Sequence, residues 1–574
     1  MKYRRYIVVF ILSLLSCTPA LSYGTSCIRR TISYDTPLAA ISLIYEDQYH
    51  NSVLLAEEVD YIAQAAPNIV DVFSIGHSYL GKEMRVLKIT NETITRQKAK
   101  TLVVAQHHGR EQITVEMALR FILYLVNNFG SNAQITKYLN SIEIFVIPTL
   151  NPDALDRVVN ENDFWLRKNL HPYDNDYDGR YDEDPIDDAN GDGWISSYDV
   201  YERLDENSNI YLYSYFEGID DDGDGKFNED EIGYVDLNRN YDAGWGGSGS
   251  SGDPTDQTYR GRKPFSEPET QAMRDFAEKH RFAMAFSLHS GINATYLPSD
   301  MNGYVEPDLY ESVFQDFAEI LPDSFITGGY TSLSQDGPII EADHAGKWND
   351  WMYVERNTPV PVCFEIFHDG RVDDASHYTI YSQNSTHVIT EWHDIFGYFN
   401  PPANKIDFLW IRIRSAFTYL LDMIPQLDVK IESLPNTSDS PNDIRVDVEI
   451  SCLAPRIGTV DPIFVQTFDN ETVHSWSAID AGDTLHDQLI LTLPFDASIE
   501  PVTLFVGNNY TGFYPVIIEK SDLTTITEVS STSSNTITES TSITDSPIDI
   551  SYILIATSFG LVIIVAILIV RIRK

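Results

Sequence analysis

The stretch "TLVVAQHHGREQITVEMALRFILYLV", Thr101 to Val126, changes pattern abruptly in its middle. It begins with an apolar run, which is typical of a buried strand, and it ends with apolar residues at the spacing of a helix. Two histidines, an arginine and a glutamate stand between the two halves. Because ligands bind beyond the carboxyl ends of the strands in open α/β sheets, this junction predicts a functional site.

The same alternation extends over residues 42–425. Short apolar runs occur at 84–89, 101–106, 142–149, 281–290 and 360–367. Amphipathic helix patterns lie between them, such as "SEPETQAMRDFAEKH", in which Ser266 and Glu269 have the spacing of a capping box. This organisation predicts an α/β domain whose sheet carries helices on both faces.

Residues 427–520 have a different pattern. Segments such as "LDVKIE", "DIRVDVEIS" and "QLILTLPF" alternate apolar and polar residues between turn signals. This period of two predicts a small β-sandwich domain, which we interpret as a spacer or stabilising module with an unidentified partner.

The two ends of the chain predict export and anchoring. Residues 1–22 resemble a secretory signal, with basic residues before an apolar run and small residues after it. Residues 521–547 are rich in Ser and Thr and have almost no large apolar residues. They cannot bury a core and therefore predict a stalk suited to O-linked sugar. Residues 551–570 carry no charge and predict one transmembrane helix, followed by the basic cytoplasmic tail 571–574. The catalytic part is therefore expected outside the cell membrane.

Composition limits the partners. The chain has 85 acidic and 40 basic residues and a net charge of −45, which opposes nucleic-acid binding. Such a charge is consistent with a salty habitat or with bound cations. Sequons for glycan attachment occur at Asn91, Asn293, Asn384, Asn436, Asn470 and Asn509. Of the four cysteines, Cys27 and Cys452 are candidates for one disulfide.

Two histidines and a glutamate predict a zinc site. His108 and Glu111 are three residues apart at the expected start of a helix, so their side chains can converge on one point. A catalytic zinc ion takes three protein ligands and keeps one open position. His289, at the end of the apolar run "AFSLHS", offers the third ligand. A single histidine of this kind is more often a core residue hydrogen-bonded to backbone, so the prediction depends on the set.

Glu365 lies inside the apolar run "VPVCFEIF". Burial raises the pKa of a carboxyl group, and a carboxylate with a raised pKa beside a metal suits a general base in hydrolysis. The alternative interpretation is a buried ion pair with an arginine.

The motifs together resemble those of the zinc metallocarboxypeptidases. "HHGRE", "NPDALDR", "WLRKN", "VDLNRNYDAGWG", "SLHS" and "CFEIF" follow one another in the order found in that family, most similar to the carboxypeptidase A and T type. The resemblance implies a three-layer α/β/α sandwich with a mixed sheet. It also implies hydrolysis of the C-terminal peptide bond of peptides and proteins by a zinc-activated water.

The same resemblance implies roles for individual residues. The zinc ligands would be His108, Glu111 and His289, and the general base would be Glu365. Arg167 would polarise the scissile carbonyl and stabilise the oxyanion.

The implied substrate contacts surround this centre. Arg110 would help to bind the substrate, and Asn238 with Arg239 would hold its terminal carboxylate. Aligning "AGKWNDWMY" with the family places Asn349 at the base of the side-chain pocket. It also places Ala342 where the family has a mobile tyrosine, which is a departure from the pattern.

A second departure is an acidic insertion at residues 170–234, which contains three candidate calcium loops. The first offers Asp174, Asp176, Asp178 and Asp182. The second offers Asp188, Asn190, Asp192 and Asp199. The third offers Asp220, Asp222, Asp224, the Lys226 carbonyl, Asn228 and, as the closing residue, Glu231. Two or three structural calcium ions are therefore predicted, and a solvated acidic loop is the alternative.

The leading functional prediction is a membrane-anchored zinc carboxypeptidase acting on peptide or protein C-termini. Two alternatives are a peptidase on cell-wall or other non-standard peptides and a non-catalytic, calcium-stabilised surface adhesin. Intact candidate ligands and an intact candidate base argue against the adhesin.

Overall fold

The computed structural model describes residues 40–205, 208–298, 307–322, 326–327, 345–368, 379–392, 395–434, 440, 442–494 and 502–518. The predicted signal, Cys27, Ala342, the stalk, the transmembrane segment and the cytoplasmic tail lie outside these residues. Within the described part of the chain, the helices are too short or too polar to span a membrane. All described residues belong to the first of two compact units, Met1–Thr525.

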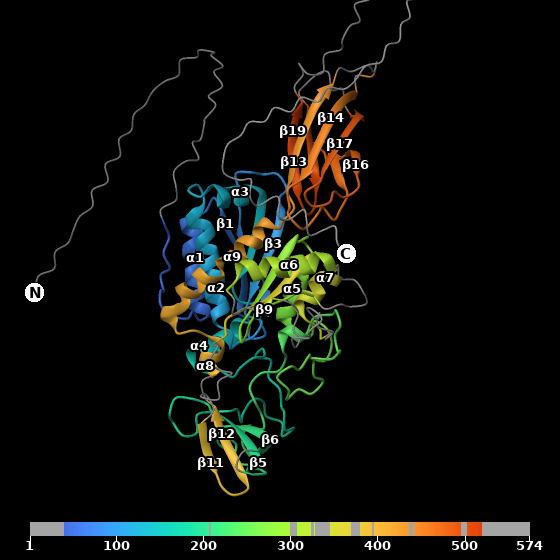
Figure 1. Ribbon diagram of the computed structural model, residues 1–574. Helices are drawn as coiled ribbons and strands as arrows, with labels where there is room; N and C mark the ends of the chain where they lie inside the picture. The colour runs from blue at the N-terminus through green and yellow to red at the C-terminus, as the bar shows by residue number, and fades with distance from the viewer. Residues whose placement is uncertain are drawn as a thin grey trace, which may run out of the picture. The chain divides into compact units, whose positions relative to one another are not determined.

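An eight-stranded mixed sheet forms the centre of the first domain (Figure 1). Its strands, in spatial order, are β1 (Val70–His77), β2 (Glu83–Ile89), β4 (Ile142–Ile147), β3 (Ala99–Ala105), β7 (Met284–His289), β10 (Val360–Ile366), β8 (Asn293–Tyr296) and β9 (Ile326–Thr327). The central strands β4, β3, β7 and β10 are parallel to one another. β1 and β2 pair antiparallel with their neighbours, whereas β8 pairs antiparallel with β10 and parallel with β9. The predicted mixed α/β sheet is therefore confirmed.

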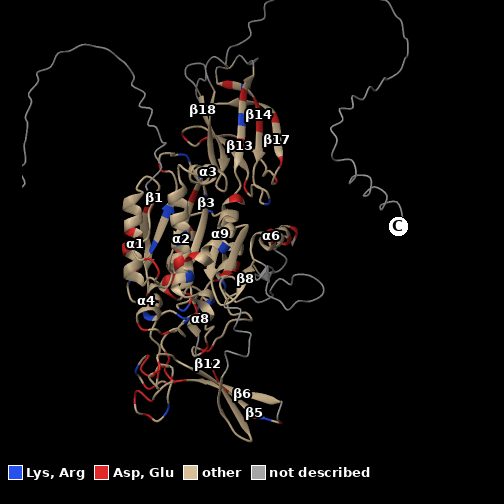
Figure 2. Cartoon of the chain, turned by 60° about the vertical axis from the view of Figure 1, so that its left-hand side comes forward, with Lys and Arg blue, Asp and Glu red and all other residues tan. Residues whose placement is uncertain are grey.

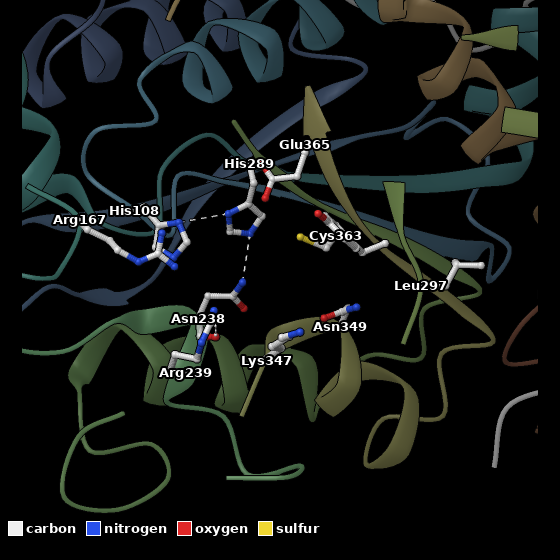
Figure 3. Close-up of a pocket in the computed structure, with 11 residues that line it drawn as sticks. His108, Arg167, Asn238, Arg239, His289, Leu297, Lys347, Asn349, Cys363 and Glu365 are labelled. Atoms are coloured by element: carbon white, nitrogen blue, oxygen red, sulfur yellow. Dashed lines mark hydrogen bonds between the residues drawn. The ribbon is translucent and has the colours of Figure 1, made fainter. Parts of the chain in front are cut away.

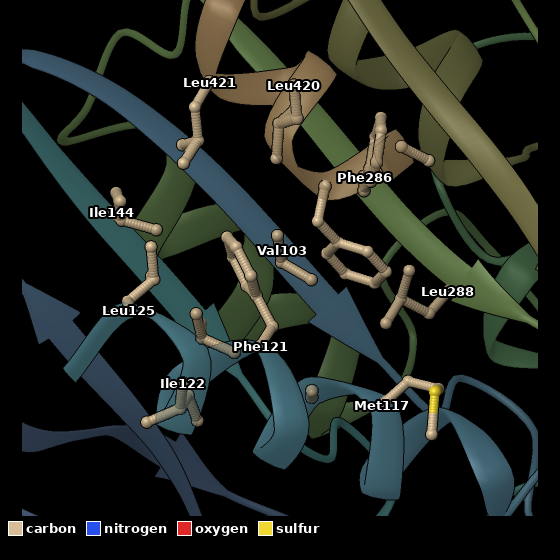
Figure 4. Packing of buried hydrophobic residues seen from close by; sticks show 14 of the residues in the cluster. Val103, Met117, Phe121, Ile122, Leu125, Ile144, Phe286, Leu288, Leu420 and Leu421 are labelled. Carbon is tan, nitrogen blue, oxygen red and sulfur yellow. The ribbon is translucent and has the colours of Figure 1, made fainter. Parts of the chain in front are cut away.

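Helices cover both faces of this sheet. They are α1 (Ser52–Ala65), α2 (Ile113–Asn128), α3 (Ala133–Ser141), α4 (Pro152–Asn160), α5 (Pro268–Ala277), α6 (Pro307–Ile320), α7 (Trp348–Val354), α8 (Ile395–Phe399) and α9 (Ile406–Asp422), with short 3-10 turns η1 (Leu237–Arg239) and η2 (Ala403–Lys405). Alternate residues of β3 enter different cores, as the pleat requires. Val103 packs with residues of α2 and α9 (Figure 4), whereas Leu102 and Val104 belong to the cluster that contains residues of α5 and α7.

Two further sheets lie in the region predicted as a β-sandwich. One contains β13 (Leu427–Leu434), β14 (Asp443–Cys452) and β17 (Thr484–Thr492). The other contains β16 (Thr472–Trp476), β15 (Ile463–Gln466), β18 (Val502–Asn508) and β19 (Gly512–Ile518). Their inward residues share one buried cluster. Cys452 is buried there and forms no disulfide with a described residue.

A small four-stranded sheet was not expected from the sequence. Its strands are β5 (Ser197–Arg203) and β6 (Asn209–Phe216) from the insertion, and β11 (Thr379–Gln383) and β12 (His387–Trp392) from the segment after β10. Every residue of β11 is exposed, and so is most of β6. These strands lack the buried apolar face that makes a strand recognisable in sequence.

The two ends of the insertion meet at its base. The Asn169 N–H donates to the Val235 carbonyl at 3.0 Å, and the Tyr234 N–H donates to the Asn169 carbonyl at 3.1 Å. The insertion therefore leaves and rejoins the α/β domain at nearly one place.

Candidate active site

The site lies where three adjacent parallel strands end. β3 pairs with β7, and β7 pairs with β10, so their carboxyl ends lie at one edge of the sheet. In the β7–β10 register, Glu365 stands directly beside His289. The topology thus brings together the residues near positions 105, 289 and 365, as the rule for open α/β sheets predicts.

The "HHGRE" segment forms a tight turn rather than the first turn of a helix. The Glu111 N–H donates to the His108 carbonyl at 3.3 Å, and α2 begins only at Ile113. Gly109 is needed in this turn, because a Cβ there would stand 2.9 Å from both the Ala154 side chain and the Leu166 carbonyl. The turn, and not a helical face, makes the side chains of His108 and Glu111 converge.

Three side chains that can bind a metal meet in the buried centre of the site. His108 Nδ1 lies 2.7 Å from Glu111 Oε1, and His289 Nδ1 lies 3.0 Å from Glu111 Oε2. The two Nδ1 atoms are 3.3 Å apart (Figure 3). Two facing imidazole nitrogens and a carboxylate form a set that a cation can satisfy. The N₂O donor set with one open side fits a catalytic zinc ion.

Asp236 contacts the ligand His108 at the ring nitrogen that does not face the metal site. The sequence alone did not single out this residue. His108 Nε2 donates to Asp236 Oδ1 at 3.0 Å, which leaves the His108 Nδ1 lone pair for a metal. Arg167 donates to the other oxygen of Asp236, from Nε at 2.9 Å and Nη2 at 2.8 Å. Burial would raise the pKa of Asp236, but Arg167 and His108 hold it well below its usual range.

His107, the first histidine of the pair, is a core residue. Its ring nitrogens lie 3.0 Å from the Tyr241 hydroxyl and 3.1 Å from the Ser287 hydroxyl. Burial lowers the pKa of His107 well below its usual value, so it is neutral. The Ser287 hydroxyl also lies 2.9 Å from His289 Nε2 and so orients that ligand.

Glu365 faces the same pocket and has the electrostatics of a base. Its Oε2 is buried and has no hydrogen-bond partner among the described residues. Burial, together with the negative charge of Glu111, raises the pKa of Glu365 well above its usual range, although Arg167 and Arg239 oppose the shift. Within the described residues Glu365 forms no ion pair with an arginine, which argues against the alternative interpretation of this residue.

A pocket of about 190 Å³ opens beside the three ligands. Besides His108, His289 and Glu365, its lining includes four further predicted residues, namely Arg167, Asn238, Arg239 and Asn349 (Figure 3). It also includes four that were not predicted, namely Tyr296, Leu297, Lys347 and Cys363. Their positions depend on long-range packing, which residue spacing does not reveal.

Local contacts fix the two predicted carboxylate-binding residues. Asn238 Oδ1 accepts from the Trp348 N–H at 2.9 Å, and Asn238 Nδ2 lies 3.5 Å from His289 Nε2. Arg239 Nε donates to the Gly249 carbonyl at 2.8 Å. Asn349 also lines the pocket, and its buried Oδ1 has no hydrogen-bond partner among the described residues. The pocket lining therefore offers an unused acceptor.

Arg110 does not line this pocket. Its guanidinium lies 4.5 Å above the Phe399 ring and donates to the Trp165 carbonyl and the Gln257 side chain. Burial and the charge of Arg167 lower the pKa of Arg110 to about 10. The contacts of Arg110 indicate a role in holding the loops around the site.

The acidic insertion differs in part from the predicted calcium loops. Asp174, Asp176 and Asp178 bring carboxylate oxygens within 4.8 Å of one another. The turn-forming aspartates also behave as such loops require: Asp188 accepts from the N–H groups of Gly191 and Gly193, and Asp220 accepts from those of Gly223 and Gly225. The side chains of Asn190, Asp192, Asp222 and Asp224 each accept from the N–H group two residues later.

Four other predicted ligands have different surroundings. Asp199 lies in β5, where its oxygens accept from Ser214 and Tyr201. Glu231 turns toward the α/β domain and lines a cleft with Lys168. Asp182 accepts from the Tyr173 N–H, and Asn228 donates to the Phe216 carbonyl. The strand β5 and the return to the α/β domain thus draw the two expected closing residues, Asp199 and Glu231, away from their loops.

A family model described as "Zinc carboxypeptidase" matches residues 55–410. Carboxypeptidase A2 of Rattus norvegicus is 25% identical over 245 residues, which are 42% of this chain and 45% of that protein. A zinc carboxypeptidase of Saccharothrix mutabilis subsp. capreolus is 33% identical over 127 residues, which are 22% of this chain and 29% of that protein.

The chain thus spans about half the length, or less, of these curated relatives. Among solved structures, the carboxypeptidase A from Helicoverpa armigera matches with a TM-score of 0.43 and 18% identity, covering 65% of this chain and 72% of that one.

Proposed function

The chain belongs to the zinc carboxypeptidase family, and from this premise we propose that it is a zinc-dependent metallocarboxypeptidase that removes C-terminal residues from peptides and proteins. One observation carries the proposal: the buried ligand atoms of His108, Glu111 and His289 converge beside a pocket that Glu365 also lines. A hydrolytic site needs this combination of a metal with an open position and an adjacent base.

Each residue has a distinct part in the proposed reaction. When bound, zinc supplies Lewis-acid polarisation and acidifies water in the site. Glu365 accepts the proton of the attacking water and passes it to the leaving amine, because its raised pKa suits both transfers. Arg167, held by Asp236, stabilises the negative charge that develops on the carbonyl oxygen.

The pocket supports an exopeptidase. Arg239 and Asn238 stand beside the metal ligands and can bind a terminal carboxylate, which a peptide interior lacks. The small volume, about 190 Å³, suits the side chain of one residue. The Asn349 side chain offers an acceptor to a polar side chain of the substrate's C-terminal residue. Hydrolysis of a panel of peptides that differ only in this residue measures the preference.

The location of the protein and its calcium ions are further parts of the proposal. The apolar segments 1–22 and 551–570 support an exported, single-pass protein with the catalytic domain outside and the C-terminus in the cytoplasm. The DxDxDG pattern of the acidic insertion supports structural calcium.

The test compares blocked peptides that carry free or amidated C-termini, using the purified full-length chain with zinc. We expect amino-acid release from the free C-termini only. Glu365→Gln should abolish release, with kcat falling by about a thousandfold or more, while the bound zinc content is unchanged. Release from amidated peptides would contradict the exopeptidase assignment, and inactivity on every peptide with zinc bound would contradict the peptidase.

A further inference from the structure

The acidic insertion contains an internal repeat. Residues 174–184, "DNDYDGRYDED", and residues 220–230, "DDDGDGKFNED", align without a gap as D-x-D-x-D-G-(R/K)-(Y/F)-(D/N)-E-D. We name them the first and the second acidic loop. The repeat continues beyond the glycine to the Glu-Asp pair, so the repeated unit includes more than a turn.

The structure pairs the two loops through equivalent positions. Asp184 and Asp230, the last residues of the two loops, form an antiparallel bridge. Asp230 Oδ1 accepts from the Asn175 N–H at 2.7 Å, and Asp184 Oδ1 accepts from the Asp221 N–H at 3.3 Å. Each terminal aspartate thus reaches the second residue of the opposite loop, which gives the pair an approximate two-fold symmetry.

Carboxylates of both loops meet at two places. Asp178 and Glu183 of the first loop come within 4.8 Å of Asp222 of the second loop. Asp224 and Glu229 of the second loop come within 4.8 Å of Asp176 of the first loop. The two clusters occupy the same positions of the repeat with the loops exchanged, so they form one arrangement present twice.

A buried carboxylate at the pair of loops has no positive partner among the described residues. Asp184 is 1% exposed, and its Oδ2 has no hydrogen-bond partner among the described residues. Its carboxyl group lies against that of Glu229, whose two oxygens are also buried and without a hydrogen-bond partner in that part of the chain. Placing such carboxylates together is unfavourable unless a cation neutralises them.

Basic residues of the loops do not supply that cation. Lys226 Nζ lies 2.9 Å from Asp224 Oδ2 and 3.6 Å from Glu229 Oε1, and Arg180 Nη1 lies 3.2 Å from Asp222 Oδ2. Both basic side chains are more than half exposed, so these pairs contribute little to stability. Among the described residues, neither forms an ion pair with Asp184.

We propose that the two acidic loops form a single unit that binds two calcium ions, each held by carboxylates of both loops, with Glu183 and Glu229 as the closing ligands. An all-oxygen, carboxylate-rich set is the one that calcium prefers. The inference deepens the calcium part of the proposed function and does not depend on peptidase activity. It assigns to Glu229 the role that residue spacing gave to Glu231.

The experiment titrates calcium into the metal-free full-length chain by isothermal titration calorimetry. In the Glu183→Gln/Glu229→Gln variant, the number of ions bound should fall by two, with affinity at each site reduced at least about tenfold. The control is Glu231→Gln, which removes one carboxylate charge two residues beyond Glu229 and should leave the ion count unchanged. A loss with Glu231→Gln and none with the double variant would overturn the assignment.

A second pair of variants tests the sharing between loops. Asp176 and Glu229 belong to one proposed site, so Asp176→Asn/Glu229→Gln should lose one ion. Asp176 and Glu183 belong to different sites, so Asp176→Asn/Glu183→Gln should lose two. If each loop closed its own site, the two results would be exchanged, and that outcome overturns the proposal, as does the absence of calcium binding by the unmodified chain.

Zinc content and peptide hydrolysis, measured on the same samples, keep the two proposals separate. Full zinc content shows that a variant is folded around the active site. Calcium binding without hydrolysis would contradict the proposed function alone. Hydrolysis without calcium binding would contradict the paired-loop unit alone.

Discussion

Asp236 links the metal ligands to the residue proposed to stabilise the oxyanion. One of its oxygens accepts from His108, and the other accepts from Arg167. A single carboxylate therefore fixes the tautomer of a ligand and the direction of a guanidinium.

Replacing Asp236 with Asn is expected to weaken both functions. One oxygen becomes an amide that cannot accept from Arg167 or His108, so zinc affinity should fall about 10- to 100-fold and kcat should fall more than KM rises. Zinc affinity is measured by competition with a chelator. Asp163→Asn is the control, because Asp163 is also buried but pairs with Arg157. Equal effects of the two changes would contradict this role.

Glu269 is expected to make stability depend on pH. It is fully buried, where it accepts from the Tyr79 N–H, and burial raises its pKa to about 7. The folded state therefore holds the proton more tightly than the unfolded state. The resulting stability is present below pH 4.5 and is lost as pH rises through about 7.

Glu269→Gln removes that titration. The free energy of unfolding of the variant, relative to the original chain, should increase between pH 5 and 8 by on the order of 3 kcal/mol. Denaturant unfolding at several pH values measures it. A difference that stays constant with pH would show that Glu269 is ionised throughout.

Among individual residues, the sequence predicted the metal ligands and the base better than the residues that hold them in place. Spacing and apolar context singled out His108, His289 and Glu365, because the ends of strands are visible in sequence. Asp236 and Asp184 were missed, because their roles depend on contacts with His108 and with the second acidic loop, which lie far away along the chain.

Among the structural elements, the start of α4 holds the "HHGRE" turn in place. Asn151 caps this helix by accepting from the Ala154 N–H. Its Nδ2 donates to the carbonyls of His107 and Lys168, both at 3.2 Å. The cap thus joins the zinc turn to the segment that carries Arg167.

Asn151→Ala should therefore affect stability and activity together. We expect a loss of about 2–3 kcal/mol in the free energy of unfolding and a clear fall in kcat/KM, because two buried carbonyls lose their donor. Asn132→Ala is the matched control, since the Asn132 side chain caps α3 through the N–H groups of Gln134 and Ile135 and forms no other hydrogen bond within the described part of the chain. It should cost about 1 kcal/mol and leave kcat/KM unchanged. Similar kinetics for the two variants would contradict the link.

Helices and strands with a strong hydrophobic periodicity could be predicted from the sequence. The residues at which they begin and end were harder to predict. The run at 101–106 became β3 almost as predicted. The capping box at Ser266 does not form, because α5 begins at Pro268 and Glu269 instead binds the Tyr79 N–H. A distant backbone group competed successfully for that side chain, and local spacing could not reveal it.

For the molecule as a whole, the net charge is the property that can be counted most directly from the sequence. The net charge is −45, and Figure 2 shows Asp and Glu along the loops of the insertion and on β14 and β17. A surface of this kind attracts cationic substrates at long range and repels anionic ones.

Hydrolysis of basic peptides should therefore depend on ionic strength. Between about 20 and 500 mM salt, kcat/KM for a peptide with several lysines upstream of its C-terminal residue should fall severalfold, because salt screens the attraction. A neutral peptide with the same C-terminal residue serves as the control and should change little. Parallel salt dependence for both peptides would show that steering is absent.

The meeting of Asn169 with Tyr234 and Val235 has a consequence for the history of the chain. A segment whose two ends are already hydrogen-bonded to each other can be lengthened or replaced without moving the framework at its base, provided that β5 still pairs with β12. The base of the insertion is thus a place where one segment can be exchanged for another. Exchange of this one segment gives evolution, or a protein engineer, a way to change the surroundings of the cleft while Arg167 and Asp236 keep their positions.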